Sequence, residues 1–407
     1  MVSSSSSRAP VAMVDRLSSL SDALLHAIMS FLPVRQAVQT CVLSRRWEDL
    51  WCTMPCLRID QQEFSTAASG ARDDLESDRE SIHFEEFVNS LLMFHKAPSL
   101  DLFQFNVTEN YAFEVVKRWF RRVFKCCPAV VLISSSADSR FYGLPRLGSS
   151  SHCLRRLHLI EIALDKGFTQ HLSSACPVLE DLALGRCHLD SPEITSYTLK
   201  SLIVIDCTTY YGNVLTITTP AVVYFNLSIT VVGWNWDGVL VDEMPALVEA
   251  VVCLNSQYRS RSPEGPCKLL CSLVNASKLE LSGFETLSIL HEESDTFPTF
   301  SNLRTLLLDG CELSDDFEIL GCFLNGAPSL EKLTLQYCMF PQSSRKRTRT
   351  EHLQRMSTKC QDALTFQCPN LKLTEIKYKE NDVHQLFELL SCIWRNLKKT
   401  TIVLTKG

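Results

Sequence analysis

The sequence has few glycines, no long apolar run and no surplus of positive charge, and each absence excludes a class of protein. With 14 glycines in 407 residues, it contains no glycine-rich phosphate-binding loop. No stretch approaches about 18 continuous apolar residues, which argues against a transmembrane helix and a membrane partner. Lysine and arginine total 40 against 46 acidic residues, which argues against a nucleic-acid partner.

The first residues carry no apolar segment of the kind that a signal peptide needs. Met1 to Arg8 are mostly serine, so we expect the cysteines to be reduced, in the nucleus and/or the cytoplasm. Hydrophobic residues make up 45% and charged residues 21%, which is typical of a folded chain. A length of 407 residues predicts two to three domains or one long repeat array.

Cysteine is abundant, at 18 residues, without a recognisable metal-binding pattern. There is no Cys-x-x-Cys pair, and neither Cys52 and Cys56 nor Cys267 and Cys271 have a second ligand pair nearby. His152-Cys153 lacks the third member of a nucleophilic site. We therefore predict buried thiols, no metal or other cofactor, and a protein that is not an enzyme.

The N-terminal part predicts a tail, a small helical module and a linker. Residues 1–13 are serine-rich and favour a disordered tail. Residues 14–56 contain apolar residues at helical spacing, with Ser21 and Asp22 as N-cap types and Pro33 ending the first run. Residues 57–96 are interpreted as an acidic linker, with a loop over 61–82, followed by a helix.

Residues 97–370 contain a repeated unit with leucine at positions one, four and six and cysteine at position nine. Nine of the ten gaps between successive units fall in the range of about 20–29 residues that leucine-rich repeats use. The clearest units begin at Leu179, Leu303 and Leu330, and those at Leu154, Leu199 and Leu247 fit with changes at single positions. Weaker matches begin at Leu100, Cys127, Val222, Ala276 and Leu371.

Each unit predicts a short strand. Positions four and six share one face, and a small residue at position nine can lie inside and bond neighbouring backbone. The rest of the unit returns on the outer side, often as a helix, with 166–175 one candidate. One repeat cannot bury its apolar face alone, so the units stack. The predicted fold class is α/β: a small all-helical module followed by a leucine-rich-repeat solenoid, a curved parallel sheet with outer helices.

The gap of 41 residues before Leu371 indicates an insertion. Residues 341–360 are interpreted as a basic loop, with Arg345, Lys346, Arg347 and Arg349 as a candidate nuclear-import signal; a plain solvated loop fits equally well. Residues 371–407 predict a capping unit that ends in a strand at Thr400 to Leu404.

The N-terminal module resembles a plant F-box, and the C-terminal part resembles the leucine-rich and FBD-like region of plant F-box proteins. The residues that carry this are Asp15-Arg16-Leu17-Ser18-x-Leu20, Leu24-Leu25-x-x-Ile28-Met29-Ser30-Phe31-Leu32-Pro33, Ala37-Val38-x-Thr40 and Leu43-Ser44-Arg45-Arg46-Trp47-x-x-Leu50-Trp51. The family usually has proline where this chain has Ser21, which can still cap a helix.

The resemblance implies a substrate-recognition subunit of an SCF-type (Skp–cullin–F-box) ubiquitin ligase. The F-box would dock on a Skp-type adaptor, which links to cullin and RING subunits, and the repeats would hold a protein substrate. Trp47 is the strongest candidate for a binding hot spot. The implied adaptor-binding residues are Leu20, Leu24, Leu25, Ile28, Leu32, Pro33, Val42 and Trp47.

The strand positions that do not point into the core are candidates for substrate contact. Mixed charges there suit a protein or peptide partner, although a solvated strand face carries the same pattern. The candidates are Arg155, Arg156, His158, Glu180, Asp181, Arg304, Asp309, Glu331, Lys332 and Tyr337.

Two other functions remain open. The chain could be a leucine-rich scaffold whose F-box does not bind the adaptor, for which Ser21 is the sequence hint. It could also be a receptor in which a small ligand cements the substrate to the repeats.

Overall fold

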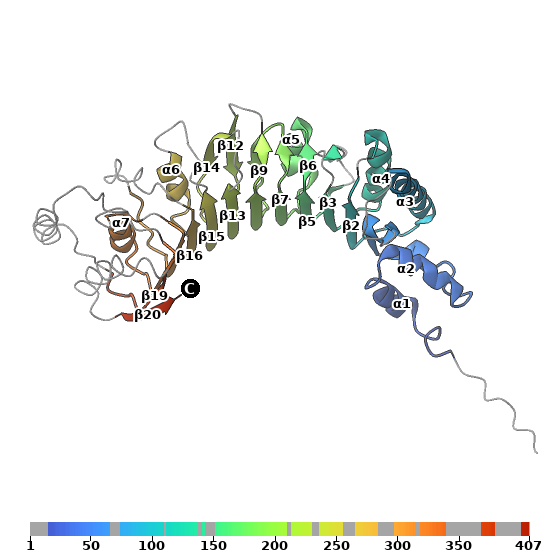
Figure 1. Cartoon of the computed structure of the whole chain (residues 1–407), viewed down its shortest axis with the longest axis horizontal. Coiled ribbons are helices and arrows are strands. Elements are labelled where there is room, and N and C mark those ends of the chain that lie inside the picture. Colours follow the sequence, from blue (N-terminus) through green and yellow to red (C-terminus); the bar gives the residue numbers. More distant parts are fainter. Residues whose placement is uncertain are drawn as a thin grey trace, which may run out of the picture.

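The structure of the chain, a computed structural model, describes residues 15–65, 74–109, 111–136, 141–142, 151–209, 213–229, 236–254, 265–283, 297–311, 313, 318–338, 368–378 and 400–406. It combines an N-terminal helical unit with a large parallel sheet whose strands stand side by side along an arc (Figure 1). Within these residues, no helix is both long and apolar enough to cross a membrane.

The N-terminal unit is made of short helices, as the spacing predicts. It contains α1 (Asp22–Met29), α2 (Val34–Gln39) and the 3₁₀ turns η1 (Thr40–Val42) and η2 (Leu50–Thr53). The hydroxyl of Ser21 accepts a hydrogen bond from the amide of Leu24 at 3.4 Å, so the predicted cap of the first helix is confirmed.

The main sheet has thirteen strands, and every neighbouring pair is parallel. Its strands, in spatial order, are β1 (Cys56–Asp60), β2 (Leu102–Val107), β3 (Val130–Ser135), β5 (Arg156–Ile160), β7 (Asp181–Gly185), β10 (Ser201–Ile205), β13 (Tyr224–Ile229), β15 (Glu249–Leu254), β16 (Lys278–Ser282), β17 (Thr305–Asp309), β18 (Lys332–Gln336), β19 (Leu373–Tyr378) and β20 (Thr401–Lys406).

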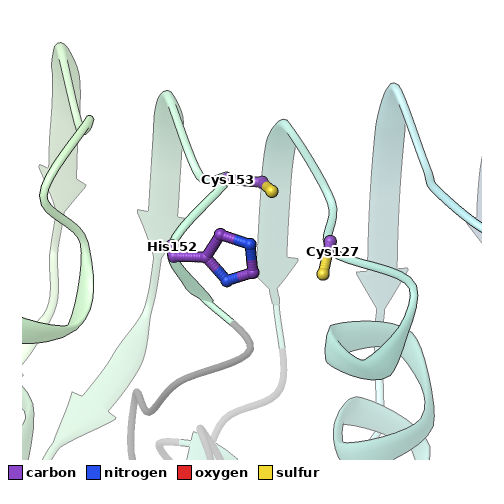
Figure 2. A group of neighbouring side chains, drawn as sticks. All are labelled: Cys127, His152 and Cys153. Atoms are coloured by element: carbon purple, nitrogen blue, oxygen red, sulfur yellow. The ribbon is translucent and has the colours of Figure 1, made fainter.

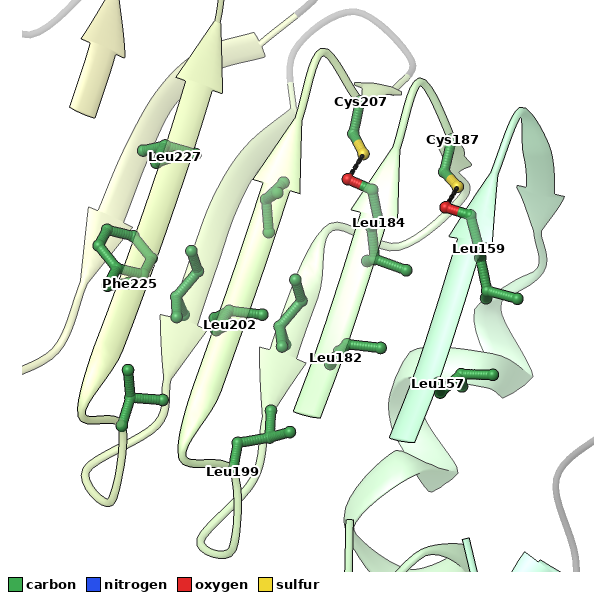
Figure 3. Close-up of a cluster of buried hydrophobic side chains, with 14 of the residues drawn as sticks. Leu157, Leu159, Leu182, Leu184, Cys187, Leu199, Leu202, Cys207, Phe225 and Leu227 are labelled. Atoms are coloured by element: carbon green, nitrogen blue, oxygen red, sulfur yellow. Dashed lines mark hydrogen bonds between the residues drawn. The ribbon is translucent and has the colours of Figure 1, made fainter. Parts of the chain in front are cut away.

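Positions four and six of successive units stack into continuous apolar ladders inside the sheet. Leu157, Leu182, Leu202 and Phe225 lie in register on neighbouring strands, and all four are fully buried (Figure 3). A parallel strand buries alternate side chains, so the leucine spacing fixes which face of each strand points inward. The buried residues form one cluster that runs from Leu25 to Ile376.

The return segments differ partly from the prediction of outer helices. Helix α5 (Lys166–Ala175) has the predicted bounds, and α6 (Gly265–Ser272) and α7 (Glu318–Gly326) also return on the convex side of the arc (Figure 1). Several units return instead as strands, which pair with one another across units. These strands form two small sheets. One contains β4 (Phe141–Tyr142), β6 (Ile162–Leu164), β8 (His188–Leu189) and β11 (Thr208–Thr209). The other contains β9 (Glu193–Thr195), β12 (Asn213–Thr218) and β14 (Trp236–Val241).

The prediction of a linker over 57–96 is wrong at its start, because the sheet begins at Cys56. Leu57 and Ile59 of β1 pair in register with Phe103 and Phe105 of β2 and are fully buried. A short 3₁₀ turn, η3 (Gln61–Phe64), follows β1, and helix α3 (Asp74–Phe94) begins inside the predicted loop. The acidic composition of this segment hid the start of α3. Strand β1 was missed because its unit has no leucine at position one, so the repeat pattern gives little signal there.

The unit predicted to begin at Cys127 is wrong by one residue. Val131 and Ile133 of β3 align with Leu157 and Leu159 of β5, so position one belongs to Pro128. Cys127 follows helix α4 (Phe113–Lys125) and has a left-handed backbone with φ of 43°. Since side chains alternate along a strand, a slip of one residue exchanges the buried and exposed sets.

The insertion before Leu371 does not disturb the order of the sheet. Strands β18 and β19 pair directly, with Leu333 opposite Thr374 and Leu335 opposite Ile376. The predicted final strand is present as β20. Residues 341–360, the import candidates among them, and the predicted tail 1–13 lie outside the described residues.

Candidate functional site

The N-terminal unit presents two opposite faces of α1, one to its own core and one to solvent. Leu25 and Met29 are fully buried, together with Trp47, whose side chain is 2% exposed. Leu24 and Ile28 point outward, and the side chain of Leu24 is 54% exposed. The four-residue spacing within each pair explains the division, since such residues share one face of a helix.

Further apolar side chains of this unit are exposed, with no element in the described part of the chain covering them. Phe31 is 80% exposed and Val42 83%, and Leu43 and Leu17 are also exposed. Leu24 and Ile28 are four residues apart, which places them on one side of α1, and Phe31 follows two residues after the end of this helix. Several large apolar side chains left in water on a unit of about forty residues favour a protein partner.

The buried Trp47 is held by polar contacts as well as by packing. Its indole N–H donates to the hydroxyl of Ser18 at 3.1 Å, and this hydroxyl lies 3.1 Å from that of Ser44. Arg46 forms a 2.7 Å ion pair with Asp22 at the start of α1. The segments before and after the two helices are therefore tied together around the indole.

Polar and aromatic contacts join the N-terminal unit to the sheet. The guanidinium of Arg35, on α2, lies 4.6 Å from the centre of the Phe64 ring and donates to the carbonyl of Glu63. The amide of Lys96 donates to the carbonyl of Cys52 at 2.6 Å. With the shared apolar core, these contacts fix the unit against the first strands of the sheet.

The open face of the sheet, opposite the face that carries positions four and six, bears cross-strand ion pairs. Asp181 pairs with Arg156 at 2.9 Å and lies 3.2 Å from the ring of His158. At the edge of the sheet, directly before the strands begin, Glu331 accepts from Lys372 at 2.7 Å and from Arg304 at 3.3 Å. Opposite charges of adjacent units thus pair with each other, on the open face and at the edge where the strands begin.

The same pairing lowers carboxyl pKa values along the sheet. The hydrogen bond and charge of Lys372 hold the pKa of Glu331 below its ordinary value, and Lys200 does the same for Glu180. The hydrogen bond from Lys332 is the main cause of the lowered pKa of Glu375. These carboxylates stay ionised at neutral pH, and the open face carries alternating charge rather than one sign.

Comparison with known proteins assigns the N-terminal unit. Residues 17–59 match the F-box domain family. The chain therefore contains an F-box domain. It is 28% identical to the MEIOTIC F-BOX protein MOF of Oryza sativa subsp. japonica over 90% of this chain and 81% of that protein. It is 27% identical to a putative FBD-associated F-box protein of Arabidopsis thaliana, over 79% of this chain and 82% of that protein. It is also 27% identical to a putative F-box/LRR-repeat protein of the same plant, over 80% of this chain and 78% of that protein.

The structure divides the eight predicted adaptor-binding residues of the F-box into three groups. Leu24, Ile28 and Val42 are exposed, and Leu20, Leu32 and Pro33 are partly buried. Leu25 and Trp47 are buried in the core of the F-box rather than exposed on its surface, and their contact with a partner stays a prediction. The family resemblance named these apolar positions but could not show which of them the F-box buries in its own core.

Other candidates emerge only from the structure. Phe31, Leu43 and Leu17 are exposed apolar residues of the F-box that were absent from the predicted set. All three lie within the F-box motif of the sequence, so the signal was available.

All ten predicted substrate-contact residues lie on the open face or at the edges of the strands. Arg155, Arg156, Arg304 and Tyr337 are exposed, and the other six are partly buried. The structure brings Arg156, His158 and Asp181 together, and it also brings Arg304 to Glu331. Lys332 reaches Glu375 at 2.8 Å, and Gln336 donates to Asp309 at 3.4 Å.

Among the described residues, one group of three side chains has the composition of a metal site. The ligand atoms of Cys127, His152 and Cys153 all lie within 4.8 Å of one another (Figure 2). The sequence prediction of no metal site did not foresee this group, because Cys127 is distant along the chain and becomes a neighbour only when β3 and β5 pair.

A cavity of about 310 Å³ lies beneath helices α3 and α4, away from the open face of the sheet. Its volume is at the lower end of the range of about 300–1,000 Å³ for small-molecule pockets. It is lined by Leu57, Leu92, Met93, His95, Leu100, Arg122, Val123, Lys125 and Cys126.

Proposed function

We propose that this F-box protein is a substrate-recognition subunit of an SCF-type ubiquitin ligase. Its F-box docks on a Skp-type adaptor, and through it joins cullin and RING subunits. The observation that carries the proposal is the exposure of Leu24, Ile28, Phe31 and Val42 on an F-box whose own core is already complete. Apolar anchors on short helices that insert into a partner's groove give this kind of docking its affinity.

In this proposal the chain binds and positions, and other subunits carry the chemistry of ubiquitin transfer. The apolar core runs without interruption from the F-box into the sheet. A substrate held on the sheet would therefore keep a defined position relative to the adaptor. Such positioning raises the effective concentration of the substrate at the catalytic subunit.

The sheet is proposed to be the strand layer of a leucine-rich-repeat solenoid that takes a protein substrate. The repeated unit, the parallel register and the F-box/LRR-repeat names of relatives support this. The alternating ion pairs of the open face suit a protein partner that presents charges of both signs. Each charged side chain of the sheet can exchange its ion-pair partner on the neighbouring strand for an opposite charge on the bound protein. We place this activity in the nucleus and/or the cytoplasm.

A pull-down of a Skp-type adaptor by the intact chain tests the proposal. Wild-type chain is expected to retain the adaptor, and the Ile28→Asp and Val42→Asp double variant is expected to lose it while keeping the wild-type melting temperature. Val178→Asp is the matched control, because Val178 is an exposed apolar residue far from the F-box. No retention by wild type, where a known F-box chain is retained, would overturn the proposal.

The observations favour adaptor binding over the two alternatives. The scaffold hypothesis rested on Ser21, and this residue caps α1 and leaves the helix intact. The ligand-gated receptor would need a pocket where substrate binds, whereas the cavity described above lies on the α3–α4 side.

A further inference from the structure

Two cysteines and a histidine converge where the chain enters two neighbouring strands. Cys127 precedes β3, and His152 and Cys153 precede β5. The three side chains point toward the space between these two entry loops (Figure 2). Each offers a ligand atom, and no two of these atoms are more than 4.8 Å apart.

The repeat register explains why the two thiols meet. Val131 is opposite Leu157, so Cys127 and Cys153 occupy the same place in adjacent units, directly before position one. Neighbouring strands are about 4.8 Å apart, which brings equivalent side chains close together. The equivalent residues of the other described units are Thr53, Ser99, Val178, Thr198, Ala221, Ala246, Asn275, Asn302, Ser329 and Asn370. Cysteine stands at this place only in this adjacent pair.

The backbone holds both loops in place. The amide of Cys127 donates to the carbonyl of Phe124 at 3.1 Å, which ends α4 in the left-handed turn. The amide of Arg155 donates to the carbonyl of Ala129 at 2.8 Å, which ties the second loop to the first. A ligand that binds here meets side chains whose main chain is already ordered, so little conformational entropy is lost.

We propose that Cys127, His152 and Cys153 bind a zinc ion through two thiolates and one imidazole, with a fourth coordination position open. Sulfur and imidazole are the ligands that zinc prefers, and two cysteines with one histidine and an open position form a known class of zinc site. On binding, each thiol releases one proton as its sulfur–zinc bond forms, and no electron is transferred.

The observed spacing suits this ion. Ligand atoms around a tetrahedral zinc lie about 3.5–3.8 Å apart, given bonds of about 2.3 Å to sulfur and 2.1 Å to nitrogen. The side chains therefore need to close by about 1 Å at most, which rotation about the χ1 angles can supply. His152 is exposed and both cysteines are partly buried, so the fourth position faces solvent and accepts water or a side chain of a bound protein.

Cobalt titration of the reduced full-length chain tests the site, because cobalt bound to thiolate absorbs light and zinc then displaces it. Wild type is expected to bind one cobalt with thiolate-to-cobalt absorption that zinc abolishes. Cys127→Ser and Cys153→Ser should each weaken binding by about 100-fold or more, since even the loss of outer-shell partners costs about 10–100-fold. Cys126→Ser is the matched control, because Cys126 is next to Cys127 in the sequence but its thiol contacts the carbonyl of Arg122 at 3.8 Å instead. This variant should bind cobalt like wild type.

His152→Ala provides a variant that keeps the fold, because this side chain is exposed. Circular dichroism confirms that each variant is folded before titration. Absence of the thiolate absorption in reduced wild type overturns the proposal, and so does equal absorption in the Cys127→Ser and Cys153→Ser variants. Neither result bears on adaptor binding, which does not involve these residues.

Discussion

The thiol of Cys187 donates a hydrogen bond to the carbonyl of Leu159 on the neighbouring strand, at 3.3 Å (Figure 3). The same link recurs from Cys207 to Leu184, from Cys311 to Leu281 and from Cys338 to Leu308, each at 3.4 Å. Position nine of one unit therefore binds position six of the unit before it. Burial raises the pKa of Cys338 to about 12, so its thiol keeps the proton that it donates.

Removing one of these thiols should lower the stability of the sheet. Cys311→Ala deletes a fully buried sulfur and its hydrogen bond, and we expect a loss of about 1–2 kcal/mol in the free energy of unfolding. Urea denaturation measures the change. Cys271→Ala serves as the control, because Cys271 is exposed, and equal effects of the two substitutions would contradict a structural role for position nine.

Two glycines at position eight should respond differently to alanine. Both have left-handed backbones, with φ of 70° at Gly283 and 58° at Gly310. A Cβ at Gly283 would lie 2.4 Å from the carbonyl oxygen of Leu254, whereas one at Gly310 would meet nothing within 4 Å. We expect Gly283→Ala to cost about 3 kcal/mol or more and Gly310→Ala about 1 kcal/mol, measured by urea denaturation. Similar losses would show that close backbone approach does not distinguish the two sites.

Trp47 and Val42 should separate folding of the F-box from binding by it. Trp47→Ala removes a buried indole and the hydrogen bond to Ser18, and we expect destabilisation by about 3–5 kcal/mol. Val42→Asp changes an exposed residue and should leave the melting temperature unchanged while weakening retention of a Skp-type adaptor. A Trp47→Ala variant with wild-type stability would refute the core role assigned to the indole.

Glu63, at the junction of the F-box and the sheet, should make stability depend on pH. Burial, assisted by the charge of Asp60, raises the pKa of Glu63 from 4.5 to about 7, despite the opposing charge of Arg35. Between these values the folded chain binds more protons than the unfolded chain, so the free energy of unfolding falls as the pH rises. At pH 8, Glu63→Gln is expected to stabilise the protein by about 1 kcal/mol, allowing for solvent screening.

The control for this prediction is Glu193→Gln, since Glu193 is exposed. Thermal melting of the wild type and both variants from pH 4.5 to 8 makes the comparison. The Glu63→Gln variant should lose part of the pH dependence that wild type and Glu193→Gln share. An unchanged profile for Glu63→Gln would exclude this carboxyl as the source.

Local spacing was enough to predict the strands and most of their register. Leu182 and Leu184, or Leu306 and Leu308, must share one face of a strand because the side-chain period is two, and repeated units must stack to bury that face. The left-handed backbone conformation at position eight, by contrast, could not be predicted from the residue types at that position. Glu161, Arg186, Asp206 and Tyr337 adopt positive φ there as well as the glycines.

Hydrogen bonds between units explain that conformation. At position eight the amide donates to the carbonyl at position seven of the next strand, as from Arg186 to Ile205 at 2.7 Å and from Tyr337 to Lys377 at 2.9 Å. The ladder of hydrogen bonds between strands therefore continues through the turn. The free energy of these bonds outweighs the preference of residues other than glycine for negative φ. Such a bond joins residues of different units, so no local pattern reveals it.

The sequence by itself determined that the chain has a helical module and an array of short strands, because periodicity dictates which side chains must be buried together. The resemblance of its motif added that the module is F-box-like. Only the tertiary structure decided that Trp47 faces inward while Val42 faces outward, and that open-face charges pair across strands. It also decided that Cys127 meets His152 and Cys153. Each of these depends on contacts between segments distant along the chain, and the pairing of strands, not local spacing, sets those contacts.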